Sequence, residues 1–204
     1  MSLLITRPYY DPVTHYFFNW SEEIIKEAER VGLKLFDLTK EKAVKKKVES
    51  YLAKQNPDLV IFNGHGDDFC ITGQDNDILI SANNNESLLK DKYVYIRACS
   101  CGKVLGIKIR NAGAKGFIGY KKSFILLRKI ESLRRPLEDE VAKPFLECSN
   151  KVGLALVRGC SAKEAHEASI KKYKEKINNL FVSNSPYTFI LPYLRANMNN
   201  QVCY

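Results

Sequence analysis

Short apolar runs alternate with amphipathic stretches along this chain, and this alternation restricts the fold more than any other feature of the sequence. Two runs of strand length, residues 58–63 and 93–98, are almost wholly apolar, as expected of parallel strands that are buried on both faces. Further strands are predicted at residues 3–6, 33–38 and 115–120. Apolar residues at helical spacing predict helices at residues 21–31, 40–54, 103–111, 138–158 and 161–180. The pattern predicts a mostly parallel sheet with helices on both faces, a three-layer α/β sandwich.

Local signals place the starts of two of these helices. Ser21 precedes two acidic residues and is predicted to be the N-cap of helix 21–31. Ser161 and Glu164 have the spacing of a capping box at the start of helix 161–180.

A polar stretch, residues 67–85, separates two of the predicted strands. It contains two short apolar runs, residues 69–72 and 78–81, which predict a small hairpin outside the main sheet. Residues 187–204 are expected to form a short strand or helix that closes one edge. The sequence has no repeat and no linker, so residues 1–204 are predicted to form a single domain.

The composition favours a globular protein without a membrane span. Of the 204 residues, 45% are hydrophobic, and no apolar run reaches the length of a transmembrane helix. The first residues lack the pattern of a secretory signal. The six cysteines are therefore expected to be free thiols in a reducing compartment, and the protein is expected to be cytoplasmic.

A net charge of +9 raises the question of nucleic-acid binding. The densest lysine cluster, Lys40 to Lys47, lies on a predicted amphipathic helix without interleaved aromatic residues. This arrangement favours a solvated helix face over a nucleic-acid interface. No glycine-rich dinucleotide or phosphate loop follows the first strand, so no nucleotide cofactor is expected.

Two residues with catalytic chemistry follow neighbouring predicted strands. His65 lies between two glycines directly after strand 58–63, and Cys99 follows strand 93–98. Sites in parallel α/β sheets gather beyond the carboxyl ends of the strands. Taken singly, His65 is best explained as a histidine in a turn and Cys99 as a buried cysteine at a strand end. Taken together, they indicate a nucleophile and its base.

A cysteine peptidase needs three features that this placement offers. A nearby imidazole raises the thiolate fraction of the cysteine and later protonates the leaving amine. The start of a helix after the cysteine, predicted here at residue 103, also favours the thiolate. An oxyanion needs backbone N–H donors, and the N–H groups of Gly66 and Cys99 are the candidates.

The two loops resemble those of the caspase–hemoglobinase clan of cysteine peptidases. Phe62-Asn-Gly-His-Gly66 is similar to the histidine loop of metacaspases and CHAT-domain proteases, and Arg97-Ala-Cys-Ser-Cys-Gly102 to their nucleophile loop. The segment from Val104 to Gly119 resembles the helix and strand that follow the cysteine in CHAT-domain and gingipain-like members. The resemblance implies a caspase-like fold, His65 as base and Cys99 as nucleophile, because the nucleophile directly follows the alanine. Cys101 is an additional thiol.

The resemblance also implies residues of a substrate pocket. The residue two before the cysteine lines that pocket in the family, and this position is Arg97. Alternation along a strand places positions 97 and 99 on the same side. An unpaired Arg97 would select a carboxylate, whereas a pair with Asp11 would neutralise the pocket. Arg7, at the end of the first strand, is the other candidate substrate-binding residue.

Several alternatives remain open on sequence grounds. Asp67 and Asp68 could hold Arg97 or bind calcium, although two adjacent aspartates are weak evidence for a metal site. The chain could be a catalytically inactive interaction module of the same fold. Zinc binding by Cys70, Cys99, Cys101 and His65 is a further alternative, although the spacing is not that of a zinc knuckle. We expect no metal, a protein or peptide substrate, and an activating partner or second subunit as a further candidate partner.

Overall fold

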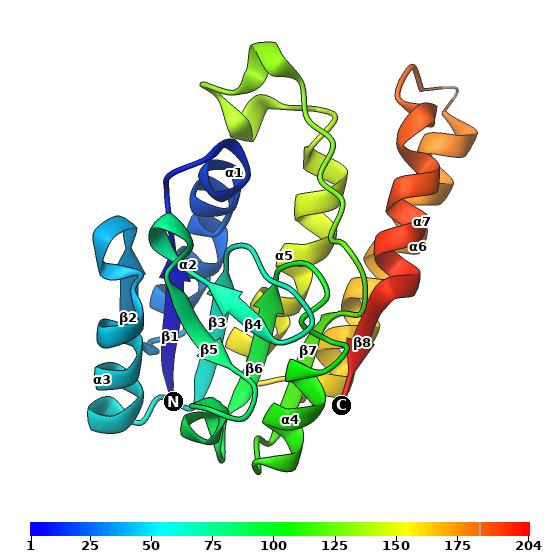
Figure 1. Ribbon diagram of the computed structural model, residues 1–204. Helices are drawn as coiled ribbons and strands as arrows, with labels where there is room; N and C mark the ends of the chain where they lie inside the picture. Colours follow the sequence, from blue (N-terminus) through cyan, green and yellow to red (C-terminus); the bar gives the residue numbers. More distant parts are fainter. Residues whose placement is uncertain (184) are drawn as a thin grey trace.

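The computed structural model describes residues 1–183 and 185–204 and is built around a six-stranded sheet with the strand order β2-β1-β3-β6-β7-β8. The strands that run parallel are β1 (Ser2–Arg7), β2 (Lys34–Thr39), β3 (Leu59–Asn63), β6 (Tyr93–Arg97) and β7 (Gly116–Tyr120). The edge strand β8 (Gln201–Cys203) is antiparallel to β7. All five predicted parallel strands are confirmed (Figure 1).

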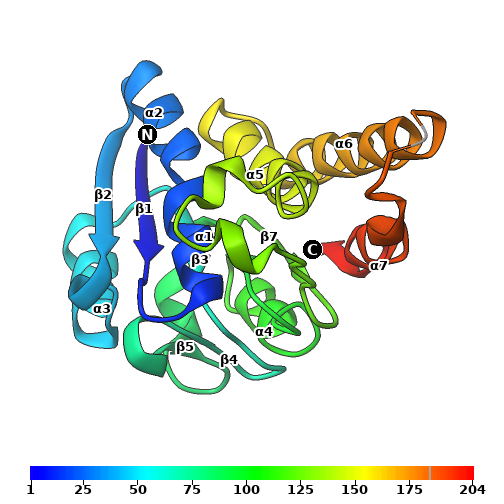
Figure 2. The ribbon, with the colours of Figure 1, turned by 90° about the horizontal axis from the view of Figure 1, so that it is seen from above.

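Helices cover both faces of this sheet (Figure 2). One face packs against α1 (Pro12–Trp20), α2 (Glu22–Arg30), α5 (Lys143–Val157), α6 (Ala162–Val182) and α7 (Leu191–Asn200). The other packs against α3 (Lys45–Gln55), α4 (Leu105–Asn111) and the hairpin of β4 (Cys70–Thr72) and β5 (Ile78–Ser81). The three-layer sandwich and the accessory hairpin are therefore confirmed.

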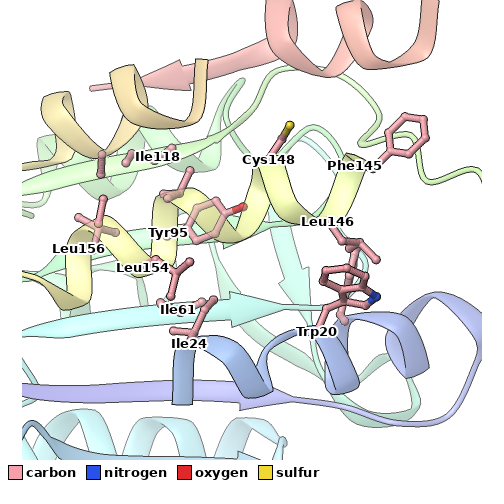
Figure 3. Close-up of a cluster of buried hydrophobic side chains, with 14 of the residues drawn as sticks. Trp20, Ile24, Ile61, Tyr95, Ile118, Phe145, Leu146, Cys148, Leu154 and Leu156 are labelled. Atoms are coloured by element: carbon pink, nitrogen blue, oxygen red, sulfur yellow. The ribbon is translucent and has the colours of Figure 1, made fainter. Parts of the chain in front are cut away.

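The two cores follow from alternation along the buried strands. Ile61 and Tyr95 belong to the core beneath α2 and α5 (Figure 3), whereas Val60 and Phe62 belong to the core beneath the hairpin. Every residue of β3 is buried, which explains why residues 59–62 are apolar without alternation; the buried Asn63 at the strand end is hydrogen-bonded to Arg97.

The N-terminal half departs from prediction at one helix. Residues 12–20 form α1, with Asp11 as its N-cap and Pro12 in the first turn. Ser21 occupies the N-cap position of α2, as predicted, but it has helical backbone angles and its side chain makes no capping hydrogen bond. The chain runs from α1 into α2 with Ser21 between them.

Other boundaries shift by a few residues. Helix α3 begins at Lys45, after a 3₁₀ turn at Lys40–Lys42, and residues Glu86–Leu89 form another 3₁₀ turn. The capping box of Ser161 and Glu164 is present at the start of α6. Short 3₁₀ turns also occur at Gln74–Asn76, Ile130–Ser132, Pro136–Glu138 and Thr188–Ile190. Among the described residues, no helix combines the length and apolarity that a bilayer crossing requires.

Candidate active site

His65 and Cys99 follow adjacent parallel strands at the same level. Strand β3 pairs directly with β6, and Asn63 is the register partner of Arg97. His65 and Cys99 each lie two residues beyond this pair. The two residues therefore share one rim of the sheet, at the carboxyl ends of neighbouring strands, as the sequence predicts.

The imidazole of His65 contacts a carboxylate from the first helix. Its Nε2 atom lies 2.5 Å from Oδ2 of Asp11, and its side chain is 40% exposed. Asp11 caps α1 by accepting a hydrogen bond from the Thr14 N–H. When Nε2–H donates to Asp11, Nδ1 is the nitrogen left to accept a proton.

The charge of Asp11 is stabilised in this position. Burial by itself would raise the pKa of Asp11. The Thr14 N–H and the contact with His65 outweigh burial, so the pKa is lowered from its ordinary value. Asp11 thus remains a carboxylate at neutral pH beside the proposed base.

The loop that carries His65 is fastened to the accessory hairpin. Both the backbone N–H and the hydroxyl of Thr72 donate to the His65 carbonyl, at 2.8 and 3.1 Å. A Cβ on Gly64 would lie 2.0 Å from the Thr72 carbonyl oxygen, and one on Gly66 would lie 2.4 Å from Sγ of Cys101. The glycines on either side of His65 are therefore required by close packing.

Cys99 begins a tight turn of residues 99–101, which we call the nucleophile turn. The Cys101 N–H donates to the Cys99 carbonyl at 2.7 Å, and Ser100 between them has a φ of 57°. A non-glycine residue in this left-handed region is uncommon and is often found at functional sites. Helix α4 follows this turn and starts at Leu105, two residues later than predicted.

Two backbone N–H groups at this rim are without an acceptor. Within residues 1–183 and 185–204, no hydrogen bond is formed by the N–H of Gly66 or by that of Cys99. Both groups are thus available to an external acceptor, such as an oxyanion.

Cys101 differs from Cys99 in its surroundings. Its thiol is fully buried and lies 3.3 Å from the Cys70 carbonyl. Burial raises the pKa of Cys101 well above its ordinary value, and burial together with Asp67 raises the pKa of Cys70 to about 11. Cys99 is partly buried against the core beneath α2 and α5, and its Sγ lies 4.0 Å from the Phe124 carbonyl.

Arg97 does not line a cleft, which corrects the expectation from the sequence. Its side chain is 0% exposed, and its five N–H groups face neutral acceptors in the core. Those acceptors belong to Asn63, Ser149, Asn150, Phe17 and Ser21. No pair with Asp11 forms, because that carboxylate contacts His65 instead.

Arg7 is also engaged within the fold. It is buried and forms ion pairs with Asp37 of β2 and with Glu22 of α2. Arg7 is therefore a structural residue and not part of a substrate pocket.

The acidic pair after the histidine loop has local partners. Asp67 accepts hydrogen bonds from the Phe69 and Cys70 N–H groups, and Asp68 pairs with Lys103 at 2.5 Å. Neither aspartate holds Arg97. In the described part of the chain, no three His, Cys, Asp or Glu side chains are placed to share a metal ion.

A cavity of about 300 Å³ adjoins the contact between Asp11 and His65. It is lined by Tyr9, Tyr10, Asp11, Pro12, His15 and Leu133. The Tyr10 ring meets the His65 ring edge-on, with centroids 6.2 Å apart. Burial lowers the pKa of His15, so His15 is neutral at pH 7.

The long connection between β7 and α5, residues 121–142, lies beside this rim. Asn197 of α7 brackets Ile125, accepting from its N–H at 2.9 Å and donating to its carbonyl at 2.7 Å. The buried Asp139 accepts from the Tyr16 hydroxyl of α1 at 2.6 Å. The sequence offers no periodic signal for this connection, and its anchoring was not predicted.

Comparison with known proteins bears on the fold. In sequence, the chain matches no protein-family model and no curated protein. In structure, it is similar to gingipain R, an Arg-specific cysteine proteinase, with a TM-score of 0.58 at 12% identity. The match covers 99% of this chain and 45% of that one, so the chain spans less than half of the gingipain R chain. Protein GSU0716 from Geobacter sulfurreducens is less similar, with a TM-score of 0.47 at 13% identity over 84% of this chain and 88% of that one. The chain has the caspase-like α/β fold that gingipain R also has.

Proposed function

We propose that this chain is a cysteine peptidase in which Cys99 is the nucleophile and His65 the general base. The observation that carries the proposal is the register of β3 and β6, which brings both residues to one rim of the sheet. The contact between Asp11 and His65 supports it, because a carboxylate fixes the tautomer and orientation of a catalytic imidazole. The fold shared with a cysteine proteinase is compatible with this chemistry.

The reaction follows from these positions. His65 takes the thiol proton at Nδ1, and Cys99 Sγ attacks the peptide carbonyl. The N–H groups of Gly66 and Cys99 stabilise the resulting oxyanion. The C–N bond then breaks as His65 returns the proton to the leaving amine, and a thioester remains. Water, deprotonated by His65, hydrolyses the thioester and restores the thiol.

The cavity beside Asp11 is proposed to receive a side chain of the substrate. Its walls are aromatic and aliphatic, and His15 in it is neutral. Its carboxylate, Asp11, is already engaged by His65 and Thr14. Such a cavity suits an uncharged, bulky side chain better than a charged one. Of the three residues predicted to line the substrate pocket, Arg7, Asp11 and Arg97, it is Asp11 that lines this cavity.

A peptide library tests both parts of this proposal. The wild type should cleave peptides with a bulky apolar residue near the scissile bond. Cys99→Ala and His65→Ala should lose cleavage by at least about 100-fold, whereas Cys101→Ala should keep much of it.

The alternative is an inactive module of the same fold. It would be favoured if the folded wild type cleaves no peptide and Cys99 reacts with an electrophile no faster than the other partly buried thiols. If Cys99→Ala cleaves peptides as fast as the wild type does, the assignment of Cys99 as the nucleophile is refuted.

A further inference from the structure

Arg97 contacts the three elements that carry or lead to Cys99, His65 and Asp11. It lies on β6, two residues before Cys99, and its Nε donates to Asn63 at the end of β3, two residues before His65, at 2.8 Å. Its Nη2 donates to Ser21, directly after α1, at 2.7 Å and to the Phe17 carbonyl within α1 at 3.4 Å. Helix α1 is the helix that Asp11 begins.

The guanidinium also contacts α5 and the ring of Phe17. Its Nη1 donates to Asn150 of α5 at 2.7 Å and to Ser149 at 3.3 Å. The Phe17 ring stacks over it, 4.6 Å from the guanidinium carbon to the ring centroid. A planar group that uses its five donors in fixed directions orients its partners more strictly than an ammonium group could.

We propose that Arg97 is a positioning residue of the catalytic site. It would fix β6, β3 and α1 relative to one another, and so place Cys99, His65 and Asp11. This inference rests on the proposed function, since it concerns the placement of the proposed catalytic residues.

Within the ranges 1–183 and 185–204, no carboxylate contacts the positive charge of Arg97 directly. Tyr95 of β6, Tyr120 of β7 and Tyr173 of α6 face it, and burial raises the pKa of each hydroxyl well above its ordinary value, so all three are neutral. Glu23 of α2 is reached only through Asn150, which donates to it at 3.0 Å. Arginine remains protonated at neutral pH even when buried.

This charge lies on the side of the sheet toward which Cys99 packs. Positions two apart on a strand share a side, and Cys99 contacts the core beneath α2 and α5, where Arg97 is bound. Arg97 therefore holds the strand end that carries Cys99 on the side of the sheet on which Cys99 packs.

Matched serine variants separate positioning from general stability. Ser21→Ala removes an acceptor of Arg97 at the end of α1, whereas Ser169→Ala removes an equally buried hydroxyl on α6 that bonds to the Cys148 carbonyl. Ser21→Ala should lower kcat about 3- to 10-fold with little change in KM. Ser169→Ala should lower the melting temperature similarly and leave kcat unchanged.

Alkylation reports on the placement of Cys99 without a cleavage assay. Site-resolved mass spectrometry gives the rate at which iodoacetamide alkylates Cys99 at pH 7. Folded Arg97→Met should change that rate by at least about 3-fold, because the strand end that carries Cys99 is no longer held against α1 and α5, whereas Ser169→Ala should leave it unchanged.

The proposal is overturned if Ser21→Ala and Ser169→Ala lower kcat equally, or if folded Arg97→Met keeps both the kcat and the alkylation rate of the wild type. Should the wild type cleave no peptide, the proposed function fails. The alkylation rates of wild type and Arg97→Met would then still decide whether Arg97 positions Cys99. If Arg97→Met does not fold, the serine pair decides the positioning role.

Discussion

Asp11 acts at two places through one carboxylate. One oxygen caps α1 through the Thr14 N–H, and the other contacts Nε2 of His65. Helix capping and orientation of the base therefore depend on the same side chain. Substitutions at this position can separate the two roles, because asparagine and serine are both good N-caps but neither carries a charge.

We predict that Asp11→Asn and Asp11→Ser keep α1 stable but lower kcat/KM on the order of 10-fold, since the proposed base loses its charged partner. Asp11→Ala should lose the cap as well, at a cost of about 1 kcal/mol in unfolding free energy. Peptide cleavage and urea unfolding of the three variants measure the two effects. Equal kcat/KM in wild type and Asp11→Ser would contradict a role for Asp11 in orienting His65.

The lowered pKa of Asp11 also predicts a pH dependence of stability. A carboxyl group whose pKa is lower in the folded state stabilises the fold above its ordinary pKa of 3.8, and that stabilisation is lost as pH falls through the lower folded value. The difference in unfolding free energy between wild type and Asp11→Asn should therefore be constant near neutral pH and shrink below about pH 4. Urea unfolding at pH 7 and pH 3 checks this, and an unchanged difference would count against it.

At the residue scale, the sequence predicts the positions of the candidate residues better than it predicts their partners. His65 and Cys99 could be placed on one rim because each follows an apolar strand, and strand position alone sets that rim. The partner of Asp11 could not be found, because it depends on where α1 points. Arg97 was assigned to the pocket because the resemblance places the residue two before the cysteine there, but its side of the strand faces the core, where neutral acceptors hold it.

At the scale of elements, the accessory hairpin acts as a support for the histidine loop. Thr72 of β4 donates twice to the His65 carbonyl, and the same residue's carbonyl oxygen lies where a Cβ on Gly64 would be. The hairpin and the loop can keep this contact only if residue 64 has no side chain.

We predict that Gly64→Ala destabilises the protein by about 1–3 kcal/mol and abolishes most peptide cleavage, because the new methyl group displaces β4 and with it the loop of His65. Gly153→Ala in α5 is the control. Its Cβ would meet side-chain atoms and no backbone atom, with the terminal methyl groups of Ile24 and Ile61 at 2.6 and 3.3 Å and Cγ1 of Ile24 at 3.2 Å. Alanine also has a higher helix propensity by up to about 1 kcal/mol. Urea unfolding and cleavage assays compare the two, and equal effects would refute the specific role of Gly64.

Helix α1 shows why one element was not predicted. No helix was predicted at residues 12–20, although an aspartate before a proline is a signature of a helix start. Whether a helix forms there depends on the residues that follow, of which Tyr16, Phe17 and Trp20 are buried against the core. Aromatic residues at this spacing are neutral in helix propensity, so tertiary packing decides.

At the scale of the whole molecule, the last residues of the chain complete the sheet and contact the segment after the nucleophile turn. The backbone of Tyr204 exchanges hydrogen bonds with Phe117 of β7 at 3.0 and 3.1 Å, and the two rings stack with centroids 5.9 Å apart. The Tyr204 hydroxyl donates to the Gly102 carbonyl at 2.7 Å. The sequence indicated an element that closes an edge here, but not that β8 would run antiparallel.

These contacts predict that the edge strand contributes both to stability and to the site. Tyr204→Phe removes only the hydrogen bond to Gly102 and should cost about 1 kcal/mol in unfolding free energy. Tyr204→Ala also loses the stacked ring and should cost about 2–3 kcal/mol, less than for a fully buried aromatic because Tyr204 is half-buried. Because Gly102 directly follows the nucleophile turn, Tyr204→Phe should lower kcat more than its small effect on stability would suggest. Urea unfolding measures the effect on stability, and single-turnover cleavage measures the effect on kcat. If Tyr204→Phe loses stability without any change in kcat, Tyr204 has only a structural role at the sheet edge.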